Sequence, residues 1–177
     1  TWLLYGFLRA IAIMPFRMQF AIGKVLGRLS LLIAHDRREA CEINIKLCFP
    51  ELSDLERATL VKETFISNGI GLVEIAMAWF ANPKRFKGMI DITGIENLNS
   101  AKSKGKGVLL VGAHFSTLEM GGFLYPQGES DATYRPNANP LFYARMYNGR
   151  KRNVEGVFDR KNMRRSMRSL KAGRVLW

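Results

Sequence analysis

The sequence predicts an α/β protein whose amino-terminal half is helical. From about residue 88 onward, short apolar runs alternate with segments of helical character, which is typical of a mainly parallel or mixed sheet. Upstream of that point, the periodic segments are helical. We therefore expect three parts: membrane-associating apolar and basic helices over 1–34, further helices over 35–82, and an incomplete α/β core over 83–177. The chain begins at Thr1 and stops at Trp177 inside an apolar run, so we expect this core to be truncated at its carboxyl end.

Residues 1–34 have the pattern of helices that lie on a membrane. The segment contains no acidic residue, and its basic residues are Arg9, Arg17, Lys24 and Arg28. On a helical wheel these cations fall within an arc of about 100°, while apolar residues occupy the rest. The same cations keep each uncharged run below the roughly 18 residues of a spanning helix, although a tilted span stays an alternative. Pro15 predicts two helices, and packing on the rest of the domain is the other interpretation.

The next segment, 35–82, is expected to form two helices. A charged helix follows His35 and ends before Pro50. Ser53 and Glu56 have the spacing of a capping box, in which each residue satisfies a backbone donor of the other, and they predict a long helix to about Phe80.

Charge and cysteine content limit the partners and the compartment. The 27 Lys and Arg exceed the 15 Asp and Glu by 12, which favours nucleic acid, anionic lipid or a phosphorylated ligand as partner.

Cys41 and Cys48 lie seven residues apart on the charged helix and are expected to be buried free thiols. A reducing, cytoplasm-facing location fits them best.

The elements of the α/β part follow in order. The expected strands lie within 88–94, 107–114, 131–136 and 173–177, and the expected helices within 95–104, 116–125, 139–148 and 161–171. In the last helix, Met163, Met167 and Leu170 share one side, so the charges of Arg164, Arg165 and Arg168 should face solvent.

One strand end carries groups that could do chemistry. The apolar run 108–112 predicts a buried strand that leads into His114, and Ser116 starts a helix with Glu119 in its first turn. Catalytic groups collect at such carboxyl ends of parallel strands, and this spacing can bring the carboxylate back to the imidazole. Two other interpretations stay open: Ser116 and Glu119 also match a capping box, and His114 can be a structural histidine.

Other chemistries lack their residues. His35, His114 and two distant cysteines have no metal-ligand spacing, and neither a G-x-S-x-G elbow nor a glycine-rich phosphate loop is present. We therefore expect no metal and no cofactor. Direct attack by an acceptor hydroxyl, with His114 as general base, is the reaction that remains.

The stretches HFSTLEM and YRPN carry a resemblance to a known family. The first resembles the H-x-x-x-x-D/E motif of the glycerolipid acyltransferase superfamily. Together with RREACEINIKLCFPELS, GLVEIAMAWF and FDRKNMRRSMRSLKAGRVLW, the two resemble the late acyltransferases of lipid A biosynthesis, the lauroyltransferase-like branch. This resemblance covers nearly the whole chain.

The resemblance implies acyl transfer from an acyl carrier protein thioester to a hydroxyl of a Kdo-bearing, phosphorylated lipid A precursor. It implies His114 as base, Glu119 as its orienting partner, and Arg135 as a substrate-binding residue with Asn137 as a weaker candidate. It also implies the cytoplasmic face of a bacterial inner membrane, with no nucleic acid as partner.

Residues 145–174 form the densest basic stretch, with 11 Lys and Arg against Glu155 and Asp159. Arg160, Arg164 and Arg165 are expected to bind an anionic substrate. The alternatives for this face are binding of lipid head groups, binding of the acidic surface of a carrier protein, or plain solvation.

Two other functions stay open. One is a non-catalytic basic protein that binds membranes or nucleic acid, and the other is a glycerolipid acyltransferase of the same superfamily.

Overall fold

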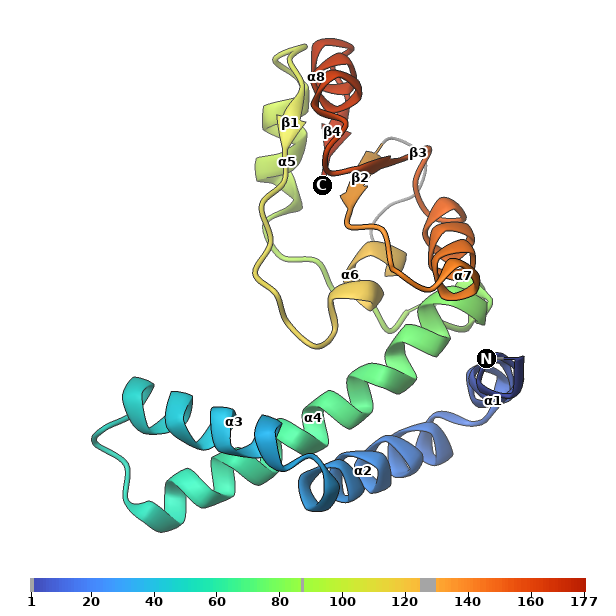
Figure 1. The fold of residues 1–177 in the computed structure, drawn as a ribbon. Helices are drawn as coiled ribbons and strands as arrows, with labels where there is room; N and C mark the ends of the chain where they lie inside the picture. The colour runs from blue at the N-terminus through green and yellow to red at the C-terminus, as the bar shows by residue number, and fades with distance from the viewer. Residues whose placement is uncertain (1, 87, 125–129) are drawn as a thin grey trace. The chain divides into compact units, whose positions relative to one another are not determined.

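The computed structural model describes residues 2–86, 88–124 and 130–177. These residues form two compact units, Leu3–Met77 and Ala78–Trp177, with Trp2 counted in the second. Figure 1 draws their helices and strands.

The first unit contains the helices that the sequence predicts. They are α1 (Trp2–Ile13), α2 (Phe16–Ile33), α3 (His35–Cys48) and α4 (Asp54–Phe80), the last of which ends in the second unit. Pro15 separates α1 from α2 as expected, and Gln19 Nε2 donates across the break to Ile11 O at 2.7 Å. The capping box is also confirmed, because Ser53 N donates to Glu56 Oε2 at 2.8 Å and Glu56 N to Ser53 Oγ at 3.4 Å.

Glycines allow α2 and α4 to pack with their backbones almost in contact. A Cβ atom placed on Gly27 would lie 2.5 Å from the carbonyl oxygen of Phe65, and one on Gly23 would lie 2.8 Å from Ile70 Cα. Gly69 of α4 faces both α2 glycines, so a side chain at any of the three positions would force the helices apart.

Helix α3 closes this unit over a small apolar cluster around Ile45, Val61 and Phe65, against which Cys41 packs. Both cysteines are free, as expected, but only Cys41 is partly buried. The prediction of a buried thiol is wrong for Cys48, which lies in the last turn of α3 beyond the cluster and is exposed.

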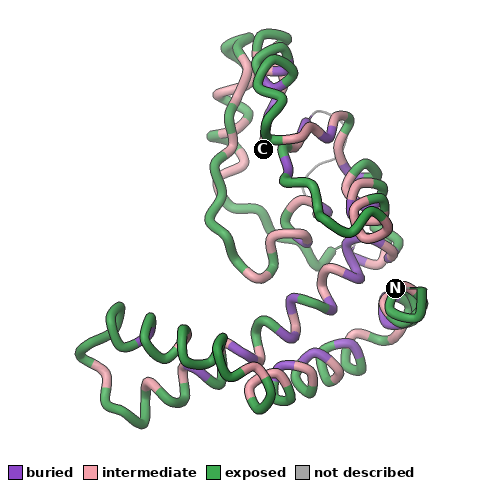
Figure 2. Tube along the Cα trace, viewed as in Figure 1, coloured by how far each residue is buried: buried purple, intermediate pink, exposed green. Residues whose placement is uncertain are grey.

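The outward faces of α1 and α2 carry exposed apolar side chains, and Figure 2 shows many exposed positions along both helices. They include Leu3, Leu4, Phe7 and Ile13 of α1 and Met18, Val25, Leu29, Leu32 and Ile33 of α2. Over the described part of the chain, the helices are too short or too polar to cross a membrane.

The second unit is built on a four-stranded, wholly parallel sheet in the order β1-β4-β2-β3. Its strands are β1 (Val108–Leu109), β2 (Ser130–Tyr134), β3 (Gly156–Asp159) and β4 (Val175–Leu176). In the register, Val175 pairs with both Val108 and Ser130, and Asp131 pairs with Gly156. The expected α/β class with a mainly parallel sheet is therefore confirmed for these residues.

Five helices accompany the sheet in the described residues: η1 (Pro83–Phe86), α5 (Ile95–Lys102), α6 (Leu118–Leu124), α7 (Pro140–Lys151) and α8 (Met163–Lys171). One predicted strand is absent, and one observed strand was not predicted. No strand forms among the described residues of 88–94, where Met89, Ile90 and Ile92 are exposed and no partner strand is paired with them. The strand β3 was not predicted, because its short apolar part lies between acidic residues and gains its order from pairing with β2.

Helix α8 buries a neighbouring side instead of the one expected, of which only Leu170 is half-buried. Ser166 and Ser169 are buried, while Met163 and Met167 are 62% and 47% exposed. The cause is a polar anchor, since Ser169 Oγ donates to the buried carboxylate of Asp131 on β2 and the small serine side chains let the helix approach the sheet. The exposed positions of Arg164, Arg165 and Arg168 agree with the prediction.

Candidate active site

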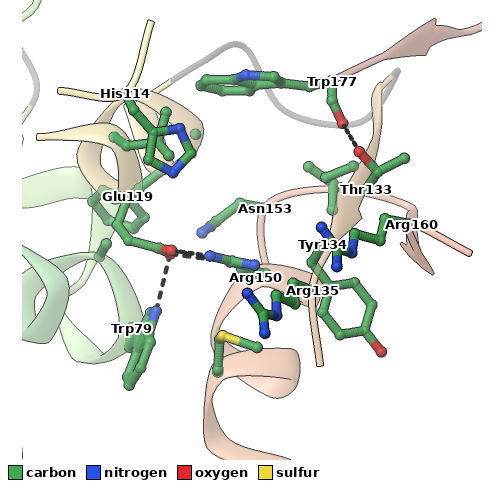
Figure 3. Close-up of a pocket in the computed structure, with 17 residues that line it drawn as sticks. Trp79, His114, Glu119, Thr133, Tyr134, Arg135, Arg150, Asn153, Arg160 and Trp177 are labelled. Atoms are coloured by element: carbon green, nitrogen blue, oxygen red, sulfur yellow. Dashed lines mark hydrogen bonds and ion pairs between the residues drawn. The ribbon is translucent and has the colours of Figure 1, made fainter. Parts of the chain in front are cut away.

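A cavity of about 480 Å³ lies within the second unit and gathers residues from six parts of the chain. Its lining comes from the end of α4, from the loop after β1 together with α6, from β2, from α7, and from the segment that runs from β3 to Arg160. Trp177, which follows β4, completes the lining. Figure 3 shows its labelled side chains. The sequence-predicted residues His114, Glu119, Arg135 and Arg160 all line it.

His114 occupies an irregular loop between β1 and α6 and is exposed. The expectation of a long buried strand before it is wrong. β1 ends at Leu109, and Leu109 and Val111 are 61% and 88% exposed because β1 is the edge strand of the described sheet. The imidazole nevertheless borders the cavity, on the side where α6 begins (Figure 3).

Glu119 lies in the first turn of α6, and its carboxylate is held by two residues from other elements. Arg150 Nε donates to both carboxylate oxygens, at 3.1 and 3.3 Å, and Arg150 Nη2 donates to Oε1. Trp79 Nε1 donates to Oε2 at 3.1 Å. In the described structure no hydrogen bond joins Glu119 to His114, so the expected orienting contact is replaced by an anchored carboxylate in the same cavity (Figure 3).

Sequence reasoning missed Trp79 and Arg150, which lie 40 and 31 residues from Glu119 in the chain. A close approach of α7 to the end of α4 brings them together. A Cβ atom on Gly149 would lie only 2.7 Å from the Trp79 ring, so the glycine permits the approach that places the neighbouring Arg150 beside Glu119. Gly149 was the one feature of the local sequence that indicated a close packing contact, but a glycine does not identify the residue that packs against it.

Arg135 and Arg160 border the cavity at the ends of β2 and β3. Arg160 N donates to Tyr134 O at 2.8 Å, which continues the pairing of the two strands and fixes the start of the Arg160 side chain. Tyr134 also lines the cavity and shares a hydrogen bond with the hydroxyl of Tyr143. Burial and this hydrogen bond raise the pKa of Tyr134 to about 12, so its hydroxyl stays protonated. Guanidinium groups in this position are suited to phosphate oxygens.

The other predicted binding residues lie outside the lining of this cavity. Asn137 is exposed, and its Oδ1 accepts from Asn139 N at 2.9 Å in the turn before α7. Arg164 borders a separate shallow hollow at the start of α8, and the Arg165 guanidinium lies 5.4 Å over the ring of Phe158. Of the described His, Cys, Asp and Glu side chains, no three are placed to hold a metal ion.

Comparison with known proteins places the chain in a family. The family model of the bacterial lipid A biosynthesis acyltransferases matches residues 1–177. The chain is 36% identical over 178 residues to the lipid A biosynthesis lauroyltransferase of Escherichia coli (strain K12), and 34% identical over 178 residues to the palmitoleoyltransferase of the same organism. Each alignment covers 100% of this chain and 58% of the relative.

A more distant relative is the lipid A biosynthesis myristoyltransferase of Escherichia coli (strain K12), which is 26% identical over 144 residues, or 80% of this chain and 45% of the relative. The chain thus spans about 58% of the length of the two more similar relatives. On the match over its whole length, the chain belongs to the bacterial lipid A biosynthesis acyltransferase family.

Proposed function

We propose that the protein transfers a fatty acyl chain from an acyl carrier protein thioester to a hydroxyl of a Kdo-bearing lipid A precursor. The observation that carries the proposal is that His114, Glu119 and two arginines of the predicted set line one cavity. Family membership supports it, as do relatives named lauroyl- and palmitoleoyltransferase.

In the proposed reaction the acceptor hydroxyl attacks the thioester carbonyl while His114 takes the hydroxyl proton. The new C–O ester bond forms, the C–S bond breaks, and the thiol of the carrier leaves with the proton that the imidazolium returns. Glu119 supplies a fixed negative charge in the same cavity, which stabilises the imidazolium as it forms. Because Trp79 and Arg150 hold this carboxylate, it needs no reorganisation during the reaction.

We assign the phosphate of the acceptor to Arg135 and Arg160, which line the cavity. Paired guanidinium N–H groups match phosphate oxygens in geometry and charge. Asn137 stays a weaker candidate, because its side-chain oxygen is engaged in the turn before α7.

The exposed cations of α8, among them Arg164 and Arg165, are assigned to the acidic surface of the carrier protein. No acidic residue interrupts this helix, which begins three residues after Arg160.

We also propose that α1 and α2 lie on the cytoplasmic face of the bacterial inner membrane. At 100° per residue, α2 has three faces. The buried face is Gln19, Gly23 and Gly27; the basic face is Arg17, Lys24 and Arg28; the exposed apolar face is Met18, Val25, Leu29 and Leu32. In a helix that lies on a membrane, the basic face binds anionic lipid while the neighbouring apolar face enters the head-group region.

The test uses the full-length protein with lauroyl and myristoyl carrier-protein donors and the tetraacylated precursor. His114→Ala is expected to lower turnover by about 10²–10⁴-fold, while the folded content measured by circular dichroism stays unchanged. His35→Ala is the matched control, because His35 is the second histidine of the chain and is exposed in α3.

Three outcomes would overturn the proposal. A wild-type protein that acylates no lipid acceptor excludes the enzyme altogether. Transfer to glycerol phosphate or a lysophospholipid, without transfer to the precursor, favours a glycerolipid acyltransferase. An unaffected His114→Ala, with function lost on charge reversal at Arg164 and Arg165, indicates the non-catalytic binding protein.

A further inference from the structure

Trp177 occupies the cavity wall in a space that glycines keep open. A Cβ atom on Gly121 would lie 3.3 Å from the indole Cη2, and one on Gly122 would lie 3.4 Å from Cζ3. On the loop before His114, a Cβ atom on Gly112 would lie 3.4 Å from the indole Nε1. The indole therefore lies against backbone from two segments, with no side chain between them.

The backbone of Trp177 is fixed by the sheet. Trp177 N donates to Asp131 O at 2.8 Å, and Trp177 O accepts from Thr133 N at 2.6 Å and from Thr133 Oγ1 at 3.2 Å. These bonds continue the pairing of β4 with β2. Since the main chain is held on one side and the glycines lie on the other, the size of residues 121 and 122 decides how far the indole extends into the cavity.

The glycines of α6 are costly for the helix itself. Glycine has the lowest helix propensity after proline, and two adjacent glycines occupy the middle of a seven-residue helix. In this structure the two glycines offset that loss of helix stability by leaving space for the Trp177 indole. If Trp177 served only to stabilise the fold, protein atoms would cover both faces of its indole. Instead, Trp177 and Gly122 both line the cavity.

The indole lies close to the proposed reaction centre. In the view of Figure 3, Trp177 and His114 lie along the same side of the cavity, apart from Arg135 and Arg160. A thioester carbonyl that reacts beside His114 must direct its first methylenes along an apolar surface. The indole offers such a surface, and Leu118 and Phe123 of α6 also line this cavity.

We propose that Trp177, seated against Gly121 and Gly122, is the wall that receives the donor acyl chain and limits its length. This inference rests on the proposed acyl transfer. Each methylene group of the donor that the cavity buries or excludes changes the ratio of kcat/KM between two donors by about fourfold. A wall displaced by the length of two methylene groups therefore changes this ratio by about fifteenfold.

The test measures kcat/KM of the full-length protein with carrier-protein donors of 10 to 16 carbons. Trp177→Ala is expected to raise the ratio of the 16-carbon to the 12-carbon donor by about tenfold or more, and Trp177→Phe by less. Gly121→Ala and Gly122→Ala push the indole into the cavity, so they are expected to move the preference toward shorter donors.

Gly6→Ala is the matched control, because a Cβ atom on this helical glycine meets nothing within 4 Å. Its donor profile should equal that of the wild type. If the Trp177 and glycine variants lower all donors by one common factor, the wall assignment is wrong while the enzyme stands. If wild-type transfer does not depend on His114, the proposed function fails first, and the two failures are thereby distinguished.

Discussion

Replacement of Arg150 by alanine tests whether the anchored carboxylate matters for turnover. Arg150 donates three hydrogen bonds to Glu119, and the two side chains are only 27% and 15% exposed. The substitution leaves Glu119 with one donor, Trp79 Nε1. A hydrogen bond to a charged group contributes about 1.5–3 kcal/mol, and partial exposure favours the lower part of that range for the set. A loss of about 1.5–2.2 kcal/mol in transition-state stabilisation lowers kcat about 10- to 40-fold.

The assay compares kcat and KM of full-length variants with one donor and one acceptor. Arg150→Lys should lose less than Arg150→Ala, and added guanidinium ion should restore part of the activity of Arg150→Ala. Trp79→Phe removes one hydrogen bond of about 1 kcal/mol, so a loss of about fivefold is expected. Lys151→Ala is the control, because Lys151 is the exposed neighbour on α7. A raised KM for the acceptor with unchanged kcat would refute the positioning role and make Arg150 a binding residue instead.

Three further predictions concern stability and membrane binding. Burial opposes ionisation of Asp131, but hydrogen bonds from Arg174 and Ser169 hold its pKa below the ordinary value. Its stabilising effect is therefore fully present above about pH 4 and is lost progressively as the pH falls from there through the lowered pKa. Asp131→Asn should lower the free energy of unfolding by about 3–5 kcal/mol at pH 7, and this difference should shrink progressively as the pH falls below about 4; an equal difference at pH 7 and at acid pH contradicts this. Gly69→Ala should destabilise by about 1–3 kcal/mol in thermal unfolding, since its Cβ atom meets the α2 backbone, and an unchanged melting temperature would exclude the close packing. Leu29→Asp should weaken binding to anionic vesicles about tenfold or more, whereas Leu55→Asp, which is 79% exposed at the start of α4, should not; equal effects would count against α2 as the membrane-facing helix.

The helices were predictable because their signals are local. Pro15 separates α1 from α2, and Ser53 with Glu56 caps α4, through contacts within a few residues. The parallel sheet followed from alternation, yet strand positions were less certain because a strand is completed by its partners. The segment 88–94 is apolar without a paired neighbour, whereas β3 forms on β2 in spite of its acidic ends.

The orientation of α8 shows why periodicity alone can choose the wrong face. Methionine at spacings of three and four predicts the buried side, but the buried carboxylate of Asp131 needs donors. Ser169 and Arg174 supply them, and this polar requirement turns the methionines outward. A contact between residues 38 positions apart has no local signature.

The same reasoning applies to the candidate site. His114 and Glu119 were found because they share one short motif, and Arg135 and Arg160 because of a motif and a basic stretch. Arg150 belongs to that stretch as well, but its contact with Glu119 depends on Gly149 packing against Trp79. Tertiary packing therefore assigns Arg150 a role that composition could not separate from solvation.

The charge of the cavity explains why a carboxylate can lie in a site proposed for an anionic acceptor. Glu119 by itself would repel a phosphate, and over distances of a few ångströms in a partly buried site that repulsion is weakly screened. The ion pair with Arg150 offsets part of the Glu119 charge. Arg135 and Arg160 then remain as two positive charges among the lining residues, with no further acid there to oppose them. The ion pair between Glu119 and Arg150 thus leaves a weakened negative charge in the cavity that His114 borders, while the rest of the cavity stays attractive to phosphate.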